Sequence, residues 1–286
     1  MFDLKETLMK QRPTLSESSI TTYNSILKNL HKKVFGDDNS GHMEDFQNTS
    51  AILSYLKDIP PNRRKTQLSA LVVLTGLKAY RDAMLDDIKE YNIEISKQEK
   101  TPTQKANWLE PVVLETKLTQ LKRDAELLYK KKNLTQNDLQ QIQNYILLVL
   151  FTGTVPRRSL DYVDFRIDNV DKKKDNYLER NEMVFNSYKT AKTYGQQRVS
   201  IPIKMKNILR KWIKVNPTPY LLFDRNYNPL SSVKLNQRLN KIFDGKKISV
   251  NALRHSFLTE KYGDISEDMS DMGSSLKMVA TYVKKD

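Results

Sequence analysis

Four groups of residues in the second half of the chain could carry out chemistry, and the first two are cations. Arg157 and Arg158 follow Pro156 where a new helix should begin, and a helix N-terminus that carries guanidinium groups is a favourable site for a phosphate. The alternative is a solvated arginine pair at a helix start. Lys189 and Lys192 stand at the tip of a predicted hairpin, where a lysine is usually just exposed.

The other two groups lie near the C-terminal end of the chain. Arg254 and His255 fall on a predicted helix, and a histidine in that position is often a hydrogen-bonded core residue. The apolar positions expected to bury one face of this helix are Val250, Leu253, Phe257 and Leu258. Tyr282 stands four residues before the end of the sequence. By itself a tyrosine there is more often packing than a nucleophile.

The composition limits the class of partner. Among 286 residues, Lys and Arg outnumber Asp and Glu by 48 to 34, and the net charge of +14 favours a polyanion such as nucleic acid. No run approaches the roughly 18 to 20 apolar residues of a membrane span, and the first residues lack the apolar core of a signal peptide. The chain has no Cys, which excludes a disulfide and a thiolate metal site. It has only three His, which disfavours a His-rich metal site.

Helical periodicity dominates residues 1–96. Thr14 to Glu17 has the spacing of a capping box, and it leads into a segment whose apolar residues recur at helical intervals. Two further helical patterns follow, in NTSAILSYLKDI and in the long segment RKTQLSALVVLTGLKAYRDAMLDDIKEYNIEI, with Pro60 and Pro61 as the break between them. Residues 97–108 lose this periodicity, so we expect a linker there.

Residues 109–286 are predicted to form a second domain. Two helical patterns open it, and NEMVFNSYKTAKTYGQQRVSIPI then alternates apolar and polar residues on either side of a Gly-containing turn, which is typical of a β-hairpin. The apolar positions of that alternation are Met183, Phe185, Val199, Ile201 and Ile203. Three helical patterns complete the domain. The fold class expected is mainly α with a small β-sheet or hairpin.

Taken in order, the Arg, the hairpin Lys, the Arg-His pair, the Gly and the Tyr resemble the tyrosine recombinase (integrase) family. TGTVPRRSLDY resembles the first box of this family, with Arg158 as its arginine and Asp161 at its acidic position. KTAK resembles the catalytic hairpin lysine, with Lys189 favoured and Lys192 as the alternate. The wording of these two motifs is closest to integrases of virophages and large DNA viruses.

The last two boxes match with two departures. NALRHSF resembles the second box, His-x-x-Arg-His, but Asn251 replaces its first histidine. MGSSLKMVATY resembles the Leu-Gly-His box followed by the nucleophilic Tyr282, but Ser274 replaces the histidine. The family varies more at these two positions than at the arginines and the tyrosine. A serine hydroxyl can donate to a phosphate oxygen but is no general acid or base near neutral pH.

The resemblance implies a site-specific DNA recombinase with a helical N-terminal core-binding domain and a C-terminal catalytic domain. Tyr282 would attack a DNA phosphodiester and form a 3′-phosphotyrosyl link, while Arg158 and Arg254 bind the non-bridging oxygens on which charge builds. Lys189 would protonate the leaving 5′-oxygen, and His255 would assist or orient. No metal and no cofactor is required.

The partners follow from the same resemblance. They are double-stranded DNA and further copies of the chain, as a tetramer on paired sites and as a monomer or weak dimer without DNA, with no membrane. The protein would act inside cells on DNA, in the cytoplasm or nucleus of a host cell if it is viral. The residues expected to contact DNA outside the catalytic set are Arg157, Lys192, Arg63, Arg64 and Lys65.

Two other functions remain open. Asn251 and Ser274 could mark a decayed active site, which would leave a DNA-binding or architectural protein. A type IB topoisomerase shares the chemistry without pairing two sites. Survival of both arginines, the lysine and the tyrosine favours an active enzyme, and the helical first domain of about 100 residues favours a recombinase over a topoisomerase.

Overall fold

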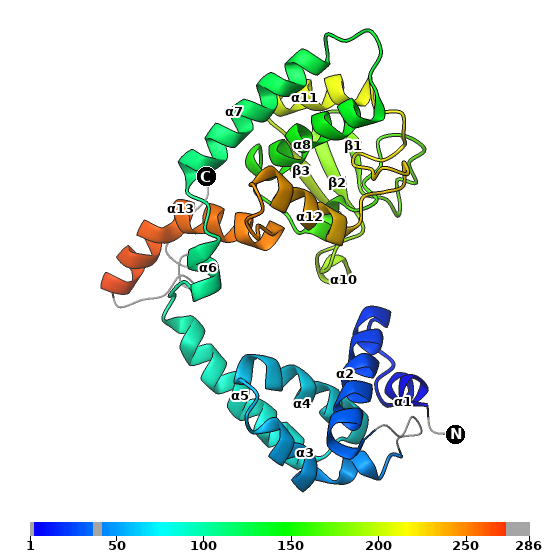
Figure 1. The fold of residues 1–286 in the computed structure, drawn as a ribbon, viewed down its shortest axis with the longest axis vertical. Helices are drawn as coiled ribbons and strands as arrows, with labels where there is room; N and C mark the ends of the chain where they lie inside the picture. The colour runs from blue at the N-terminus through cyan, green and yellow to red at the C-terminus, as the bar shows by residue number, and fades with distance from the viewer. Residues whose placement is uncertain (1–2, 37–41, 273–286) are drawn as a thin grey trace. The chain divides into compact units, whose positions relative to one another are not determined.

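The computed structural model describes residues 3–36 and 42–272, and the contacts divide the chain into two compact units, Met1–Glu99 and Lys100–Asp286. Helices dominate both units, and the described residues contain one three-stranded antiparallel sheet (Figure 1). The predicted fold class, mainly α with a small β-sheet, is confirmed. No helix in the described part of the chain is both long and apolar enough to cross a bilayer.

The first unit is a helical bundle. Its apolar positions face one core, in which Leu27 and Leu71 are fully buried and Tyr80 donates its hydroxyl hydrogen bond to the Phe46 carbonyl at 2.9 Å. The helices α4 and α5 form its most extensive contact. The elements are α1 (Leu4–Gln11), α2 (Glu17–Phe35), the 3₁₀ turn η1 (Asp45–Gln47), α3 (Thr49–Leu56), α4 (Pro61–Thr75) and α5 (Lys78–Ser96).

Two local expectations in this unit are wrong. The N-cap of α2 is Ser16, whose hydroxyl accepts the Ser19 N–H at 3.2 Å, so Thr14 does not start a capping box. The long segment predicted after the Pro pair is two helices, because Gly76 adopts a left-handed φ of 70° and ends α4. Apolar residues recur at helical intervals on both sides of Gly76, so the sequence pattern does not reveal this break.

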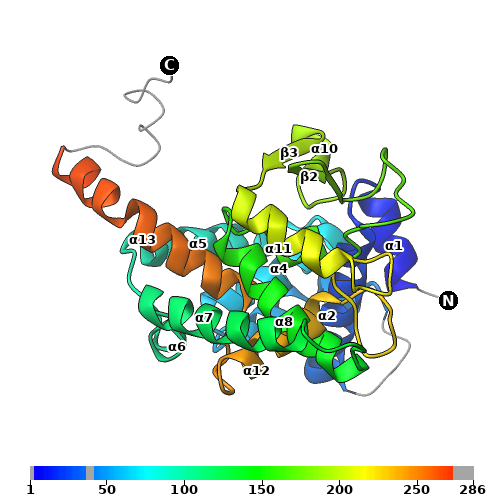
Figure 2. The same ribbon diagram turned by 90° about the horizontal axis from the view of Figure 1, so that it is seen from above.

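The second unit is built around one buried helix. Its first element, α6 (Pro102–Ala106), lies in the segment expected to be a linker. The two helices predicted next are α7 (Pro111–Leu128) and α8 (Gln136–Thr152), and the second half of α8, Tyr145–Phe151, is buried on every face. A segment that is apolar all round needs neighbours on several sides. Those neighbours include α7 and α11 (Ile203–Ile213), which lie alongside it in Figure 2, and α12 (Ser232–Ile242).

The sheet follows α8 through the one-turn helix α9 (Ser159–Tyr162). Its strands are β1 (Tyr177–Glu179), β2 (Glu182–Phe185) and β3 (Gln197–Ser200), in that order, and a one-turn helix α10 (Ala191–Tyr194) sits in the β2–β3 connection. The predicted hairpin is confirmed, with Met183 opposite Val199 and Phe185 opposite Gln197. β1 was not predicted.

The ends of two predicted patterns are wrong. Ile203 does not continue the strand alternation, because it begins α11 with 76% of its surface exposed. In α13 (Val250–Asp271), Val250 and Leu253 are buried as expected, but Leu258 is 45% exposed. Ser256 is buried on this helix instead.

Candidate functional site

The turn between α8 and α9 brings together two of the predicted site residues. α8 ends at Thr152, and Arg158 is the N-cap of α9, as the sequence predicts. Arg254, on α13, donates from Nε to the Pro156 carbonyl oxygen at 3.2 Å. The turn at residues 153–158, here called the arginine turn, therefore carries Arg158 and holds the Arg254 guanidinium, although the two arginines are almost a hundred residues apart in the chain.

Gly153 makes the close approach at this turn possible. A Cβ added there would stand 2.8 Å from the Val149 carbonyl oxygen and 3.0 Å from the Met205 sulfur of α11. The first contact is with backbone and cannot be relieved by a side-chain rotation. Glycine thus lets α11 pack closely against the end of α8.

Arg157 points inward. Its Nε donates to Asp161 Oδ2 at 2.8 Å, and its Nη1 donates to Gln197 Oε1 on β3 at 2.9 Å. Its guanidinium carbon lies 3.9 Å from the Phe185 ring centroid and 5.2 Å from that of Tyr188. Arg157 thus connects the arginine turn to strand β3 of the hairpin. Its expected contact with DNA stays a prediction.

Asp161 is the buried anion of this cluster. Its side chain is 3% exposed, and its second oxygen, Oδ1, is buried with no hydrogen-bond partner among the described residues. Burial raises the pKa of the Asp161 carboxyl, and the charges of Arg157 and Arg158 act in the opposite direction. The carboxylate therefore holds the Arg157 side chain in place beside the turn.

The hairpin turn presents the two lysines to solvent. Lys189 and Lys192 are exposed, Lys192 on α10 and Lys189 just before it. The Tyr188 hydroxyl donates to the Gly195 carbonyl at 2.7 Å and closes the turn. Gly195 has a positive φ of 66°, which a residue with a Cβ rarely adopts.

Asn176 anchors the start of this turn, and sequence reasoning missed it. The side chain is buried, and its Nδ2 donates to the Asp161 carbonyl at 2.9 Å and to the Ser187 carbonyl at 2.7 Å. Its Oδ1 accepts the backbone N–H groups of Asn186 and Ser187 at 2.9 and 2.8 Å. One side chain therefore ties α9 to the segment that leads to Lys189. A lone Asn in the polar run DKKKDNY carries no periodic signal that could reveal this role.

The remaining predicted catalytic residues fall into two groups. Asn251 and His255 are exposed on α13, so His255 is not a core histidine. Ser274 and Tyr282 lie outside the described residues. The catalytic roles of these four side chains stay predictions.

The cations expected to bind DNA from the first unit differ among themselves. Arg64 donates from Nε and Nη2 to Asp87 on α5, with Nε–Oδ2 at 2.9 Å, and from Nη1 to the Lys57 carbonyl at 3.1 Å. Lys65 Nζ lies 3.0 Å from the centroid of the Tyr91 ring. Arg63 is exposed at the start of α4. Arg63 is therefore best placed for an external partner.

The arrangement is suited to binding an anion without a metal. Arg158 and Arg254 are partly buried residues at the turn that leads into α9, and forked guanidinium N–H donors match the oxygens of a phosphate. Within residues 3–36 and 42–272 no cluster of three or more His, Asp or Glu is placed to hold a metal ion.

Comparisons with known proteins find similarity among solved structures. No family model matches the sequence, and no curated protein matches it. A crystal structure of lambda integrase bound to DNA covers 93% of this chain and 89% of its own, at 12% identity and a TM-score of 0.49. A lambda integrase tetramer bound to a Holliday junction covers 98% and 75%, at 13% identity and 0.46, and XerA recombinase covers 90% and 82%, at 11% and 0.36.

At these identities and TM-scores the similarities do not establish a family for this chain. The functional conclusion therefore depends on the site itself. Its central feature is a pair of arginines, from α9 and α13, held at one turn beside an anchored hairpin that carries two exposed lysines.

Proposed function

We propose that this protein is a site-specific DNA recombinase of the tyrosine type, which cleaves and rejoins double-stranded DNA through a 3′-phosphotyrosyl intermediate. The observation that carries the proposal is the hydrogen bond from Arg254 Nε to the Pro156 carbonyl, which holds Arg254 at the turn of Arg158. The resemblance requires the arginines of the first and second boxes to lie at one site, although the two boxes are far apart in the sequence. The net charge of +14 favours the same partner.

The proposed reaction uses only side chains. The Tyr282 phenolic oxygen bonds to phosphorus as its proton passes to solvent, the bond from phosphorus to the 5′-oxygen breaks, and that oxygen takes a proton from Lys189 or Lys192. Arg158 and Arg254 stabilise the charge on the non-bridging oxygens. The phosphotyrosyl bond keeps the energy of the broken phosphodiester, so a new 5′-hydroxyl can rejoin the strand without ATP.

The wider assignment belongs to the same proposal. Units Met1–Glu99 and Lys100–Asp286 would act as core-binding and catalytic domains on double-stranded DNA, with tetramers formed on paired sites. His255, Asn251 and Ser274 would complete the site as orienting or donor groups. The motif wording also favours a viral integrase that acts on DNA inside a host cell.

The direct test is covalent capture of DNA. Incubate the full chain with a pool of duplexes of randomised sequence, each carrying a nick that prevents religation, and recover protein–DNA adducts after denaturation. We expect an adduct with the wild type, none with Tyr282→Phe, and an unchanged yield with Tyr262→Phe, an exposed tyrosine on α13. An adduct that persists in Tyr282→Phe would overturn the nucleophile, and DNA binding without any adduct would favour the architectural alternative.

The same assay separates the two lysines. A substrate with sulfur in place of the bridging 5′-oxygen has a leaving group that needs no proton. Lys189→Ala should lose adduct formation by on the order of 10²-fold or more on normal DNA and recover it on the sulfur substrate. Recovery with Lys192→Ala instead would reassign the acid to α10.

A further inference from the structure

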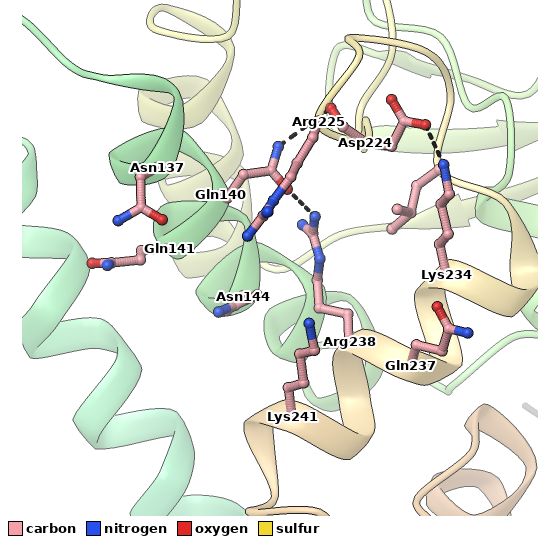
Figure 3. A pocket seen from close by; sticks show the side chains of 11 residues that line it. Asn137, Gln140, Gln141, Asn144, Asp224, Arg225, Lys234, Gln237, Arg238 and Lys241 are labelled. Atoms are coloured by element: carbon pink, nitrogen blue, oxygen red, sulfur yellow. Dashed lines mark hydrogen bonds and ion pairs between the residues drawn. The ribbon is translucent and has the colours of Figure 1, made fainter.

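A basic pocket of about 430 Å³ lies in the second unit between α8 and α12. Side chains of α8 form one wall, α12 forms another, and the loop at residues 224 and 225 closes one end. Figure 3 shows Arg225, Arg238 and Lys241 pointing into the same space in front of α8. None of the lining residues belongs to the arginine turn or the hairpin.

The single acidic side chain of this pocket is already satisfied. Asp224 accepts the Lys234 ammonium at 2.6 Å and the backbone N–H groups of Asn226 and Asn228 at 2.8 and 3.1 Å. These contacts lower the pKa of the Asp224 carboxyl, Lys234 most of all. Asp224 therefore neutralises the charge of Lys234, and it makes no ion pair with Arg225, Arg238 or Lys241, although its charge raises the pKa of Arg238 slightly against the effect of burial.

Arg238 is the most constrained of these cations. Its Nη2 donates to the Gln140 side-chain carbonyl, and its Nη1 is buried without a partner among the described residues. Burial, followed by the charge of Arg225, lowers the pKa of Arg238 to about 10. A buried donor without a partner destabilises the folded state, and more so when it is charged. Arg238 also lines the pocket, so its positive charge faces an anion held there.

The wall of the pocket fixes the position of Arg225. Gln140 Nε2 donates to the Asp224 carbonyl at 3.4 Å, and Gln136 donates to the Arg225 carbonyl. These two bonds hold the backbone of the loop against α8, and the Arg225 side chain extends from this loop in Figure 3. Asn144, also on α8, adds an amide donor at the same space.

We propose that this pocket binds a phosphate group, with Arg238 and Arg225 as forked donors and Lys241 as the third cation. Forked guanidinium donors match phosphate oxygens, and neutral amides can add hydrogen bonds without opposing charge. The phosphate can come from a free phosphate-bearing molecule or from the backbone of bound DNA. In the second case the proposal extends the function proposed above.

The first arm of the test uses inorganic phosphate. At constant ionic strength, replacing chloride by phosphate should raise the melting temperature of the full chain, because a ligand that binds the folded state stabilises it. The part of the shift that comes from this pocket should be lost in Arg238→Gln and reduced in Lys241→Gln, while any part that comes from phosphate at Arg158 and Arg254 should remain. Lys204→Gln, which changes an exposed lysine of α11 outside the pocket, should keep the full shift.

The second arm measures DNA affinity against salt. If the pocket takes a backbone phosphate, Lys241→Gln and Arg238→Gln should each reduce the slope of log K against log salt by about 0.9, whereas Lys204→Gln should not. If Arg238→Gln and Lys241→Gln change the salt slope but not the rise in melting temperature with phosphate, the pocket binds the DNA backbone. If they change the rise in melting temperature but not the salt slope, the pocket binds a free phosphate-bearing molecule. No effect in either arm overturns the proposal.

Two features keep the outcome interpretable. Lys241 is exposed, so its variant tests the pocket even if Arg238→Gln fails to fold. Both arms measure binding and neither needs DNA cleavage. If the chain forms no covalent adduct but binds phosphate in this pocket, the recombinase proposal is wrong and the phosphate-site proposal still holds.

Discussion

Each unit contains two adjacent arginines, and in each pair one guanidinium is bound by a buried aspartate. In the first unit Arg64 binds Asp87, while Arg63 is exposed. In the second unit Arg157 binds Asp161, while Arg158 caps α9 at the turn that also holds Arg254.

The two aspartates differ in how completely they are paired. Asp87 receives Arg64 donors on both oxygens, across the contact between α4 and α5. Asp161 receives Arg157 on one oxygen only, and the same guanidinium also reaches the hairpin through Gln197. The first pair therefore joins two helices, whereas the second connects two parts of the candidate site.

The largest effect is expected from a substitution that breaks the Arg64–Asp87 pair. Asp87→Ala leaves the partly buried Arg64 without its carboxylate, and such a loss costs about 3 to 5 kcal/mol in the free energy of unfolding. Asp86→Ala, at the exposed neighbouring position, should change it by less than about 0.5 kcal/mol. Urea unfolding followed by circular dichroism measures both. Equal effects in the two variants would contradict a structural role for the Arg64–Asp87 pair.

The next effect tests whether the second pair positions the site. Arg157→Lys keeps the charge but loses the fork, so the rate of adduct formation should fall about tenfold, which corresponds to about 1.4 kcal/mol. Arg198→Lys, on the same strand as Gln197 but paired with surface glutamates, is the control and should keep the rate. A single-turnover assay on captured DNA gives both rates. Lower stability with an unchanged rate would make Arg157 only a core residue.

The smallest effect concerns pH and Asp161. Burial raises the pKa of its carboxyl above the ordinary 3.8, so the folded state holds this proton more tightly than the unfolded chain does. The stability of the wild type relative to Asp161→Asn should therefore be greatest below pH 3.8 and fall as pH rises through the raised pKa. Urea unfolding at several pH values measures the difference. A relative stability that rises over this range would mean that the Arg157 pair outweighs burial.

The sequence predicted the elements of the site better than the contacts between them. The end of α8, the helix start after Pro156 and the β2–β3 hairpin all have local signals in Gly, Pro and alternating apolar residues. The inward direction of Arg157 has none, because it depends on Gln197 and Phe185, which fold beside it from later in the chain.

The pocket could not be predicted for the same reason. SVKLNQRLNKI looks like an ordinary amphipathic helix, and only its packing on α8 buries Arg238 against Gln140. The local errors have a related origin. Ser16 acts through one side-chain hydrogen bond and Gly76 through one backbone conformation, and helical periodicity in the neighbouring residues reveals neither.

Asn176 gives the hairpin an attachment that carries no charge. All four of its hydrogen bonds join an uncharged amide to backbone groups, so neither a shift in pH near neutrality nor added salt weakens them directly. Salt should loosen the hold of this protein on a polyanion while the loop bearing Lys189 keeps its shape. The salt concentration can then change the proposed affinity for a polyanion without changing the geometry of the loop that bears Lys189.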